Sequence, residues 1–304
     1  MYRRNSLRLK KQNQQSNCKA IRPHGSTKYK TMKKNIIYII VFASLSLLAC
    51  KNKGTETTNE PVATPTECGE SDHLINATLW MQHSAEYRAC CMQTYKIAKS
   101  ALAENIKNKQ TDKPAAVVLD IDETVLDNSY YEAYMAAEAT SFCDSTWAIW
   151  TSKADATEVP GAIDFLKYAQ SLGVEIIFIS NRYPEELEPT MANMKKLGFP
   201  DVPAENFYMK EKDASSCKKE RREKVSEKYE IVMLVGDNLG DHSEIFDERK
   251  TKGDMLSETD EIVELLGSRY IVLPNPTYGT WEKPILADKE KSSRENRIKA
   301  LKTF

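Results

Sequence analysis

The stretch that decides the fold is AAVVLDIDET, residues 115–124. Its first five residues are apolar, and the acids Asp120 and Asp122 come soon after them. A continuous apolar run without polar alternation is typical of a strand that is buried on both faces of a sheet. The stretch therefore predicts an interior strand of a parallel sheet, with two carboxylates at its carboxyl end.

Similar apolar runs recur farther along the chain, and helical patterns lie among them. The further strand-like runs are residues 174–180, 231–237 and 270–273. The helical patterns are residues 74–107, 162–172, 185–197 and 218–229. This alternation predicts an α/β fold whose parallel sheet carries helices on both faces. Ligands bind at the carboxyl ends of such strands, where this chain has Asp120, Ser180 and Asp237.

The charge of the chain is unevenly distributed. Residues 1–50 contain eleven Lys and Arg and no acid, whereas the rest of the chain contains 32 basic and 44 acidic residues. The body therefore has a net charge of −12. Nucleic-acid binding without sequence preference needs clustered cations, so the composition argues against a nucleic-acid partner.

The basic front end has the organisation of an export signal. Two lysines precede residues 36–48, which are almost wholly apolar, and Ala49 and Cys50 follow. The apolar run is shorter than the roughly 20 residues of a membrane span and suits a secretory signal. Its ending, LLAC, resembles a bacterial lipobox, so we expect a lipoprotein signal peptide at 32–49 and a lipid on Cys50. An ordinary signal peptide or a short membrane anchor stays open.

The segments on either side of this signal have few large apolar residues. Residues 1–31 are polar and basic, and we expect a disordered leader there or an upstream mis-start, with the true start at Met32. Residues 50–70 are rich in Thr, Asn, Pro and Glu and predict a flexible tether. We expect the protein in the cell envelope, anchored by its lipid. Because Lys51 rather than Asp follows the cysteine, analogy with lipoprotein sorting favours the outer membrane.

Four polar motifs follow one another in the body of the chain. They are an acid pair (Asp120, Asp122), a hydroxyl (Ser180), a lysine (Lys218) and a second acid pair (Asp237, Asp241). In this order they resemble the motifs of the haloacid dehalogenase superfamily. The resemblance implies a haloacid dehalogenase-like (Rossmannoid) parallel sheet and a small, mainly helical cap.

A closer resemblance is to the bacterial lipoprotein class C acid phosphatases, also described as lipoprotein 5′-nucleotidases. It rests on the segments 79–87, 120–129, 215–222 and 274–282, the last reading PNPTYGTWE. It covers residues 70–285, approximately, and fits the lipobox. It implies a phosphatase domain at 71–304 with a cap insertion at about 127–160.

The resemblance also assigns roles to the acids. Asp120 is the expected nucleophile, because a covalent aspartyl-phosphate divides one difficult step into two easier ones. Asp122 is the expected general acid and base. Mg²⁺, which prefers oxygen ligands, is expected on Asp120, Asp237 and the main-chain carbonyl of Asp122. Asp241 is expected to support this acidic cluster.

The resemblance implies that Ser180 and Lys218 bind the remaining phosphate oxygens. Simpler interpretations of these residues stay open, because Asp and Ser at strand ends often cap the next helix. Lys218 lies in a basic stretch, where Lys210 or Lys212 could take its role. Asp241 could be an ordinary surface acid.

The expected cap is rich in aromatic residues that could select a substrate. They are Tyr130, Tyr131, Tyr134, Phe142, Trp147 and Trp150. Such rings stack on a nucleobase or a nicotinamide ring, or they pack the core of the cap itself. The leading hypothesis is a membrane-anchored phosphomonoesterase acting on nucleoside 5′-monophosphates, nicotinamide mononucleotide among them. Other organic phosphates, a non-catalytic ligand-binding lipoprotein and a homodimeric assembly stay open.

Overall fold

The computed structural model describes residues 71–246 and 256–304 of the 304-residue chain. The expected leader at 1–31, the signal peptide at 32–49, the lipidation site Cys50 and the tether at 50–70 lie outside the described residues. None of the helices in the described part combines the length and apolar character needed to cross a bilayer.

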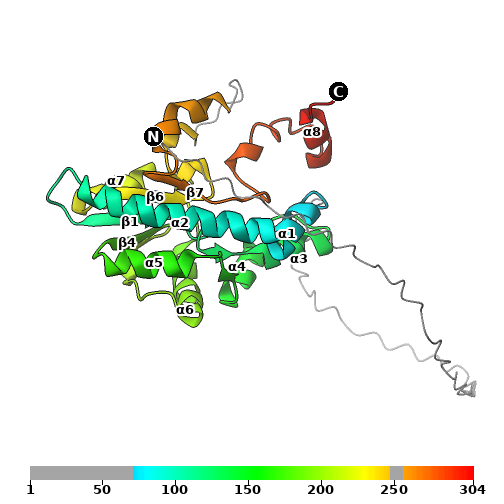
Figure 1. The fold of residues 1–304 in the computed structure, drawn as a ribbon. Coiled ribbons are helices and arrows are strands. Elements are labelled where there is room, and N and C mark those ends of the chain that lie inside the picture. Colours follow the sequence, from blue (N-terminus) through cyan, green and yellow to red (C-terminus); the bar gives the residue numbers. More distant parts are fainter. Residues whose placement is uncertain (1–70, 247–255) are drawn as a thin grey trace, which may run out of the picture. The chain divides into compact units, whose positions relative to one another are not determined.

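A parallel sheet of five strands forms the centre of the fold (Figure 1), in the order β5-β4-β1-β6-β7. The strands are β1 (Ala115–Leu119), β4 (Glu175–Ile179), β5 (Phe207–Tyr208), β6 (Glu230–Gly236) and β7 (Tyr270–Val272). The predicted α/β class is confirmed, with strands at all four predicted apolar runs. The edge strand β5 was not predicted, because two residues are too few for a recognisable pattern.

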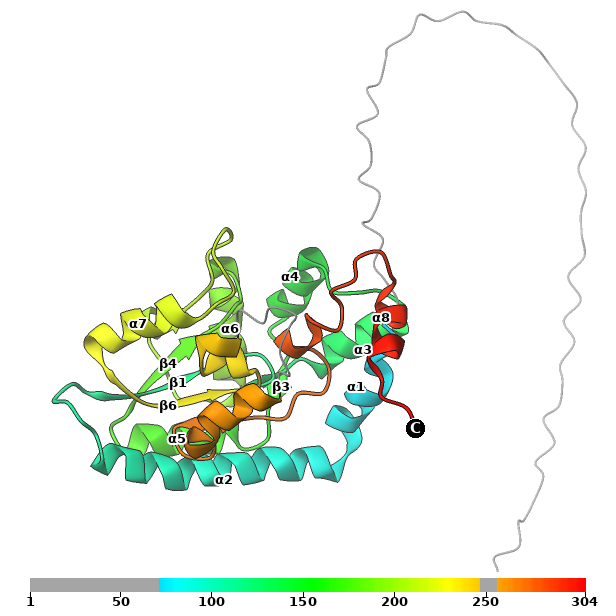
Figure 2. The same ribbon diagram turned by 90° about the horizontal axis from the view of Figure 1, so that it is seen from above.

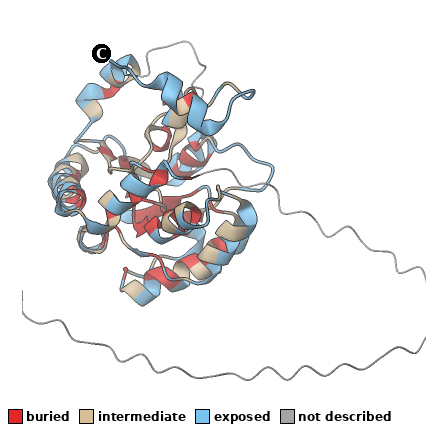
Figure 3. Ribbon diagram, turned by 90° about the vertical axis from the view of Figure 1, so that its right-hand side faces the viewer, coloured by how far each residue is buried: buried red, intermediate tan, exposed pale blue. Residues whose placement is uncertain are grey.

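Helices cover both faces of this sheet (Figure 2). They include α2 (Ala85–Lys107), α5 (Ala162–Ser171), α6 (Leu187–Leu197) and α7 (Lys219–Lys228). All five residues of β1 are buried: Val117 and Leu119 pack in the larger core with α2, α5 and α6, whereas Ala116 and Val118 pack in the core that includes Val225 of α7. Burial on both faces explains why β1 is apolar throughout, and Figure 3 shows the sheet as the most buried layer.

The helical pattern at 74–107 forms two helices rather than one. Helix α1 (Leu74–His83) ends before Ser84, and α2 begins after it. The Ser84 backbone is extended, and its hydroxyl accepts a hydrogen bond from the Tyr87 N–H at 3.0 Å. Serine is a preferred residue at a helix N-terminus because its oxygen satisfies one of the free N–H groups there. The break therefore has a local cause.

Residues 126–158 form a small insertion between β1 and α5. A two-stranded antiparallel pair, β2 (Leu126–Asp127) and β3 (Thr157–Glu158), closes it at the base. Between these strands lie α3 (Ser129–Ala137) and α4 (Asp144–Ser152). A separate small apolar cluster around Tyr131 holds α3 and α4 against α1.

Short 3-10 helices and one last α-helix complete the described elements. The 3-10 helices are Pro184–Glu186, Ala204–Asn206, Leu239–Asp241, Glu244–Phe246, Ser257–Leu265 and Thr280–Glu282. The last helix, α8 (Ser293–Ala300), begins at the Ser292 cap, whose hydroxyl accepts the Glu295 N–H. The segments after β6 and β7 matter most here, because they bring polar residues to the carboxyl end of the sheet.

Candidate active site

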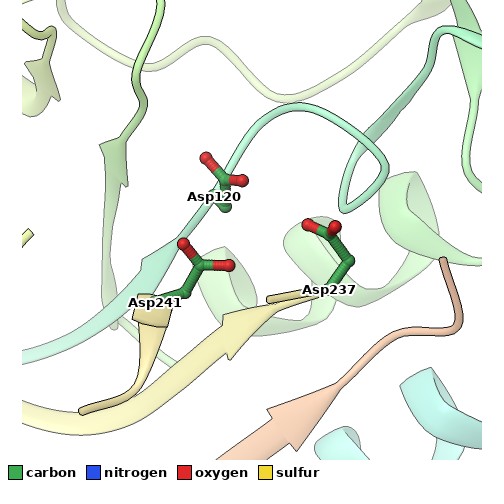
Figure 4. A group of neighbouring side chains, drawn as sticks. All are labelled: Asp120, Asp237 and Asp241. Atoms are coloured by element: carbon green, nitrogen blue, oxygen red, sulfur yellow. The ribbon is translucent and has the colours of Figure 1, made fainter. Parts of the chain in front are cut away.

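Three aspartates meet at the carboxyl ends of the two central strands. Asp120 follows β1, and its N–H donates to the Val235 carbonyl of β6 at 2.9 Å. Asp237 follows β6, and Asp241 lies in the 3-10 turn just beyond it. One carboxylate oxygen from each aspartate lies within 4.8 Å of the other two, and Figure 4 shows the side chains converging. Adjacent parallel strands thus collect acids that are far apart in the sequence.

Lys218 lies between two of these acids. Its Nζ is 2.6 Å from Asp120 Oδ1 and 2.7 Å from Asp241 Oδ1, and the side chain is buried just before α7. Burial alone lowers the pKa of Lys218, but the two carboxylates raise it above its ordinary value. Lys218 therefore stays protonated. The alternatives lie elsewhere: Lys210 lies over the Tyr183 ring and Lys212 pairs with Glu185.

Gly236 leaves the space that brings Asp241 into this cluster. A Cβ at Gly236 would lie 2.6 Å from the Cβ of Asp241, closer than carbon atoms approach. The second Asp241 oxygen accepts the Asn238 N–H at 3.1 Å, which fixes the carboxylate in the turn. Asp241 is thus a buried, oriented acid rather than an ordinary surface residue.

Asp237 is held by residues from two other segments. The Thr124 hydroxyl donates to one of its oxygens at 3.2 Å, and the Asn275 amide donates to the other at 2.9 Å. Burial raises the pKa of Asp237 to about 7, and the nearby Asp241 charge adds to the effect. Opposing hydrogen bonds and Lys218 do not cancel this rise.

The donor set of this cluster fits a divalent cation. Asp120, Asp237 and Asp241 offer three carboxylates. Among the described residues, Lys218 alone forms an ion pair with them, and it pairs with Asp120 and Asp241. Buried carboxylates repel one another unless a positive charge compensates them. Hard cations such as Mg²⁺ and Ca²⁺ bind carboxylate oxygens. The three aspartates are therefore suitable metal ligands.

Asp122 points toward a different partner. The Arg182 guanidinium donates to Asp122 Oδ1 through Nη2 at 2.7 Å and through Nε at 3.0 Å. The Asn128 amide donates to the same oxygen at 2.9 Å. Arg182 is buried, and its Nη1 donates to the Thr190 hydroxyl at 2.8 Å. Sequence reasoning gave Arg182 no role, although its position directly after Ser180 and Asn181 was the available signal.

A second layer of hydrogen bonds holds Asn128 and the acid loop, which is the loop that carries Asp122 and Glu123. The Trp150 indole donates to Asn128 Oδ1 at 2.8 Å, and the Asn128 N–H donates to Glu123 Oε1 at 2.7 Å. Glu123 is fully buried with a left-handed backbone (φ 53°), and the Tyr278 hydroxyl donates to its other oxygen. Residues from the insertion and from the C-terminal segment thus fix the loop that carries Asp122. Sequence reasoning named Asn128 and Tyr278 only as parts of motifs.

Ser180 is a predicted site residue that does not line the cavity shared by the predicted acids and Lys218. It is fully buried, and its hydroxyl accepts the Arg182 N–H at 3.0 Å. Its neighbours Asn181 and Arg182 line the cavity described below, but Ser180 itself does not. Arg221, which sequence reasoning also missed, donates to the Ser180 carbonyl at 2.6 Å and to the Asn181 side chain at 2.7 Å. A phosphate contact by Ser180 stays a prediction.

The acids open into a cavity of about 560 Å³. Its lining includes Asp120, Asp122, Lys218, Asp237 and Asp241, and also Glu132, Phe142, Trp147, Tyr278 and Glu282. Of the six rings in the insertion, Phe142 and Trp147 therefore face the cavity. The other four do not line it: Tyr131 packs in the small core, Trp150 stacks on Tyr130 at 6.3 Å between ring centroids, and Tyr134 is exposed.

The comparison with protein families identifies the class of protein. The model of HAD superfamily subfamily IIIB, the acid phosphatases, matches residues 26–281. The chain belongs to this family, whose members are phosphomonoester hydrolases, and the resemblance stated from the motifs is confirmed.

Solved structures give more particular relatives. The class C acid phosphatase from Bacillus anthracis with tungstate bound is 35% identical, with a TM-score of 0.72 over 77% of this chain and 98% of that one. A second structure of that enzyme is 36% identical, with a TM-score of 0.70 and the same coverage. The haloacid dehalogenase-like fold is thereby confirmed.

Curated relatives match a shorter part of the chain. The Stem 31 kDa glycoprotein of Glycine max is 33% identical over 134 residues, which is 41% of this chain and 52% of that protein. The chain spans about half the length of the curated relatives it matches.

Proposed function

We propose that this chain hydrolyses nucleoside 5′-monophosphates, nicotinamide mononucleotide included, through an aspartyl-phosphate on Asp120. The observation that carries the proposal is Lys218, which bridges Asp120 and Asp241 beside Asp237 at one end of a cavity. In this arrangement the carboxylate that we propose as the nucleophile lies next to a buried positive charge. The similar Bacillus anthracis enzyme binds tungstate, a tetrahedral oxyanion like phosphate, which supports an oxyanion site here.

In the first step, an Asp120 oxygen attacks phosphorus while the bond from phosphorus to the ester oxygen breaks. Asp122 donates its proton to the departing alkoxide, which leaves as an alcohol. Lys218 stabilises the charge that develops on the phosphoryl oxygens, because a buried fixed charge needs no reorganisation during the reaction. Arg182 and Asn128 orient Asp122 for this transfer.

In the second step, water attacks the phosphorus of the aspartyl-phosphate. Asp122, now a carboxylate, accepts the proton of that water. The bond between phosphorus and Asp120 breaks, and inorganic phosphate is released. Both steps therefore use the same two aspartates, with Asp122 first as an acid and then as a base.

The proposed cofactor is Mg²⁺, held by Asp120, Asp237 and the main-chain carbonyl of Asp122, with Asp241 as support. When bound, the ion supplies positive charge for the phosphate oxygens. Its charge would also oppose the rise in the pKa of Asp237, which burial causes first and the Asp241 charge increases. Ca²⁺ prefers a larger, more flexible ligand shell, so Mg²⁺ is the better match to a few carboxylates.

The proposed nucleotide specificity rests on the aromatic side of the cavity. Phe142 and Trp147 from the insertion and Tyr278 from the C-terminal segment line the same cavity as the acids. A nucleobase or nicotinamide ring stacks favourably on such side chains. Arg182 lies over the Trp147 ring at 5.6 Å. Phe142 contacts the Tyr131 and Trp147 rings but is 56% exposed, so it is the better candidate for stacking.

The proposed location is the cell envelope, with a lipid on Cys50 as outer-membrane anchor. The support is the signal-like sequence at 32–50, which ends in a lipobox-like LLAC. The test is detergent partitioning of the full chain and of Cys50→Ser in a bacterial host. The lipid-anchored chain should partition with membranes, and the variant should be released or stay unprocessed; equal behaviour would contradict the anchor.

The decisive test of the activity is a phosphate-release screen with Mg²⁺ added or chelated. Nucleoside 5′-monophosphates and nicotinamide mononucleotide are compared with sugar phosphates and p-nitrophenyl phosphate. The proposal expects turnover that needs Mg²⁺ and is highest for the nucleotides. Equal turnover of sugar phosphates would indicate a broad phosphatase, and absence of all turnover would indicate a ligand-binding protein.

A further inference from the structure

Glu132 is a buried acid whose environment the proposed chemistry does not explain. It lies in the first turns of α3, is 3% exposed and lines the active-site cavity. Its Oε2 is buried and receives no hydrogen bond from any residue in the described part of the chain. A buried acceptor left without a hydrogen-bond donor destabilises the folded state. Such a group persists in a cavity wall where a ligand satisfies it.

The neighbours of Glu132 make a purely structural role a poor explanation. Glu282 lines the same cavity, but Arg297 forms an ion pair with it. Burial raises the pKa of Glu132 to about 8, and the Glu282 charge adds to this rise. Burial is the main cause of the raised pKa values of Tyr278 and Glu123, and the Glu132 charge adds a smaller contribution to both. Glu132 therefore lies near the acid loop, and no residue in the described part of the chain donates a hydrogen bond to its Oε2.

We infer that Glu132 is a specificity-determining residue that accepts a hydrogen bond from a sugar hydroxyl on the alcohol part of the substrate. The inference rests on the proposed nucleotidase function. It adds a sugar subsite to the cavity that Asp120, Asp122 and Phe142 also line. The substrate class that it selects is phosphomonoesters of hydroxylated, ribose-like alcohols.

The position and chemistry of Glu132 both suit such a hydroxyl. The cavity that Glu132 lines also contains Asp120 and Asp122, where phosphate is proposed to bind, and Phe142, where the base is proposed to stack. In a nucleotide, ribose joins these two groups. A carboxyl group accepts a hydroxyl hydrogen bond whether it is ionised or protonated, so a neutral partner suits a carboxyl whose pKa is about 8.

The test compares matched substrates and matched variants of the full chain. The substrates are adenosine 5′-monophosphate, its 2′,3′-dideoxy analogue and p-nitrophenyl phosphate, which has no sugar. The variants are Glu132→Met, which removes the acceptor, and Glu132→Gln, which keeps a carbonyl acceptor. Glu138→Gln, at the exposed end of the same helix, is the control. Values of kcat and KM are measured together with thermal unfolding.

We expect the parent chain and Glu138→Gln to prefer the ribonucleotide about tenfold or more in kcat/KM, because a site built for a hydroxyl rejects the analogue that lacks it. Glu132→Met should lose most of this preference and keep turnover of p-nitrophenyl phosphate. Glu132→Gln should retain an intermediate preference.

Two results would overturn the inference while leaving the nucleotidase proposal intact. The first is an unchanged ribose preference in both Glu132 variants. The second is an equal loss on all three substrates in folded protein, including Glu132→Gln, which would show a structural role. Turnover of p-nitrophenyl phosphate without turnover of any nucleotide would contradict the proposed function itself.

Discussion

The two sides of the active-site cavity are built on different principles. On the sheet side, Asp120, Asp237 and Asp241 stand at strand ends, and Lys218 compensates two of them at 2.6 and 2.7 Å. On the cap side, the cavity is lined by rings and by Glu132, a carboxyl with an oxygen that no described residue satisfies. On the sheet side, three carboxylates face one lysine and form a donor set that fits a divalent cation, whereas the cap side offers rings and an unpaired carboxyl oxygen in the described structure.

This contrast assigns different tasks to the two sides. Strand ends of a parallel sheet are rigid, because their backbones are hydrogen-bonded and their side chains are buried on both faces. The insertion has a small core of its own around Tyr131, which Leu74 of α1 shares. We therefore expect changes on the sheet side to affect every substrate, and changes on the cap side to affect some substrates more than others.

The largest effect is expected on the sheet side, from Asp120→Asn. This change removes the nucleophile and one metal ligand together, so turnover of every ester should fall by about 10⁴-fold or more. Phosphate release from a nucleotide and from p-nitrophenyl phosphate measures it. Asp155→Asn, at an exposed position, is the control and should match the parent. Substantial residual turnover of either ester by Asp120→Asn would contradict its role.

Asp122→Asn should have the next largest effect, and one that depends on the leaving group. Turnover of a nucleotide should fall by about 10²–10⁴-fold, because the departing alkoxide loses its proton donor. The loss in the step that expels the leaving group should be much smaller for p-nitrophenyl phosphate, whose leaving group departs without protonation. Rapid-mixing measurements of that step on both esters test this. An equal loss on both would exclude Asp122 as the general acid.

Lys218→Met should lower both activity and stability. Loss of the positive charge beside the phosphate should cost about 10²–10³-fold in kcat, as removal of a charge-stabilising donor does. The change also leaves Asp120 and Asp241 unpaired and buried, which should lower the free energy of unfolding by about 3–5 kcal/mol. Urea unfolding and turnover are measured beside Lys212→Met, an exposed control. The opposite ranking of the two variants would return the phosphate-binding role to Lys212.

The smallest effect is expected on the cap side, from Phe142→Ala. Loss of one stacking partner, worth about 1 kcal/mol, should lower kcat/KM for a nucleotide several-fold and leave a small aliphatic phosphate almost unchanged. Tyr134→Ala, at an exposed ring of the same insertion, is the control. A uniform loss across substrates would show that Phe142 only packs the cap, and the contrast between the two sides would fail there.

The sequence was most informative where local pattern and tertiary position coincide. The apolar runs predicted the strands, because residues of β1 are buried on both faces. The strand-end acids were found for the same reason. The break at Ser84 was missed, since the apolar spacing continues through it and only the capping hydroxyl marks it.

The contacts that hold the loop carrying Asp122 and Glu123 could not be predicted in this way. Arg182 reaches Asp122 from the next strand, and Tyr278 reaches Glu123 from 155 residues away. Such contacts depend on how loops fold over the sheet, and no spacing rule encodes them. Glu132 gave no signal in the sequence, because a glutamate in a helix is usually exposed.

The central claim is that Asp120 becomes phosphorylated and that Asp122 is needed to release the phosphate. Its most direct test mixes Asp122→Asn with p-nitrophenyl phosphate and Mg²⁺, follows nitrophenol release, and locates any phosphoryl group by mass spectrometry of the quenched protein. The account predicts a rapid release of one nitrophenol per active site, then slow turnover, with the phosphoryl group on Asp120. Steady turnover without that burst and without phosphoryl on Asp120, or phosphoryl on another residue, would contradict it.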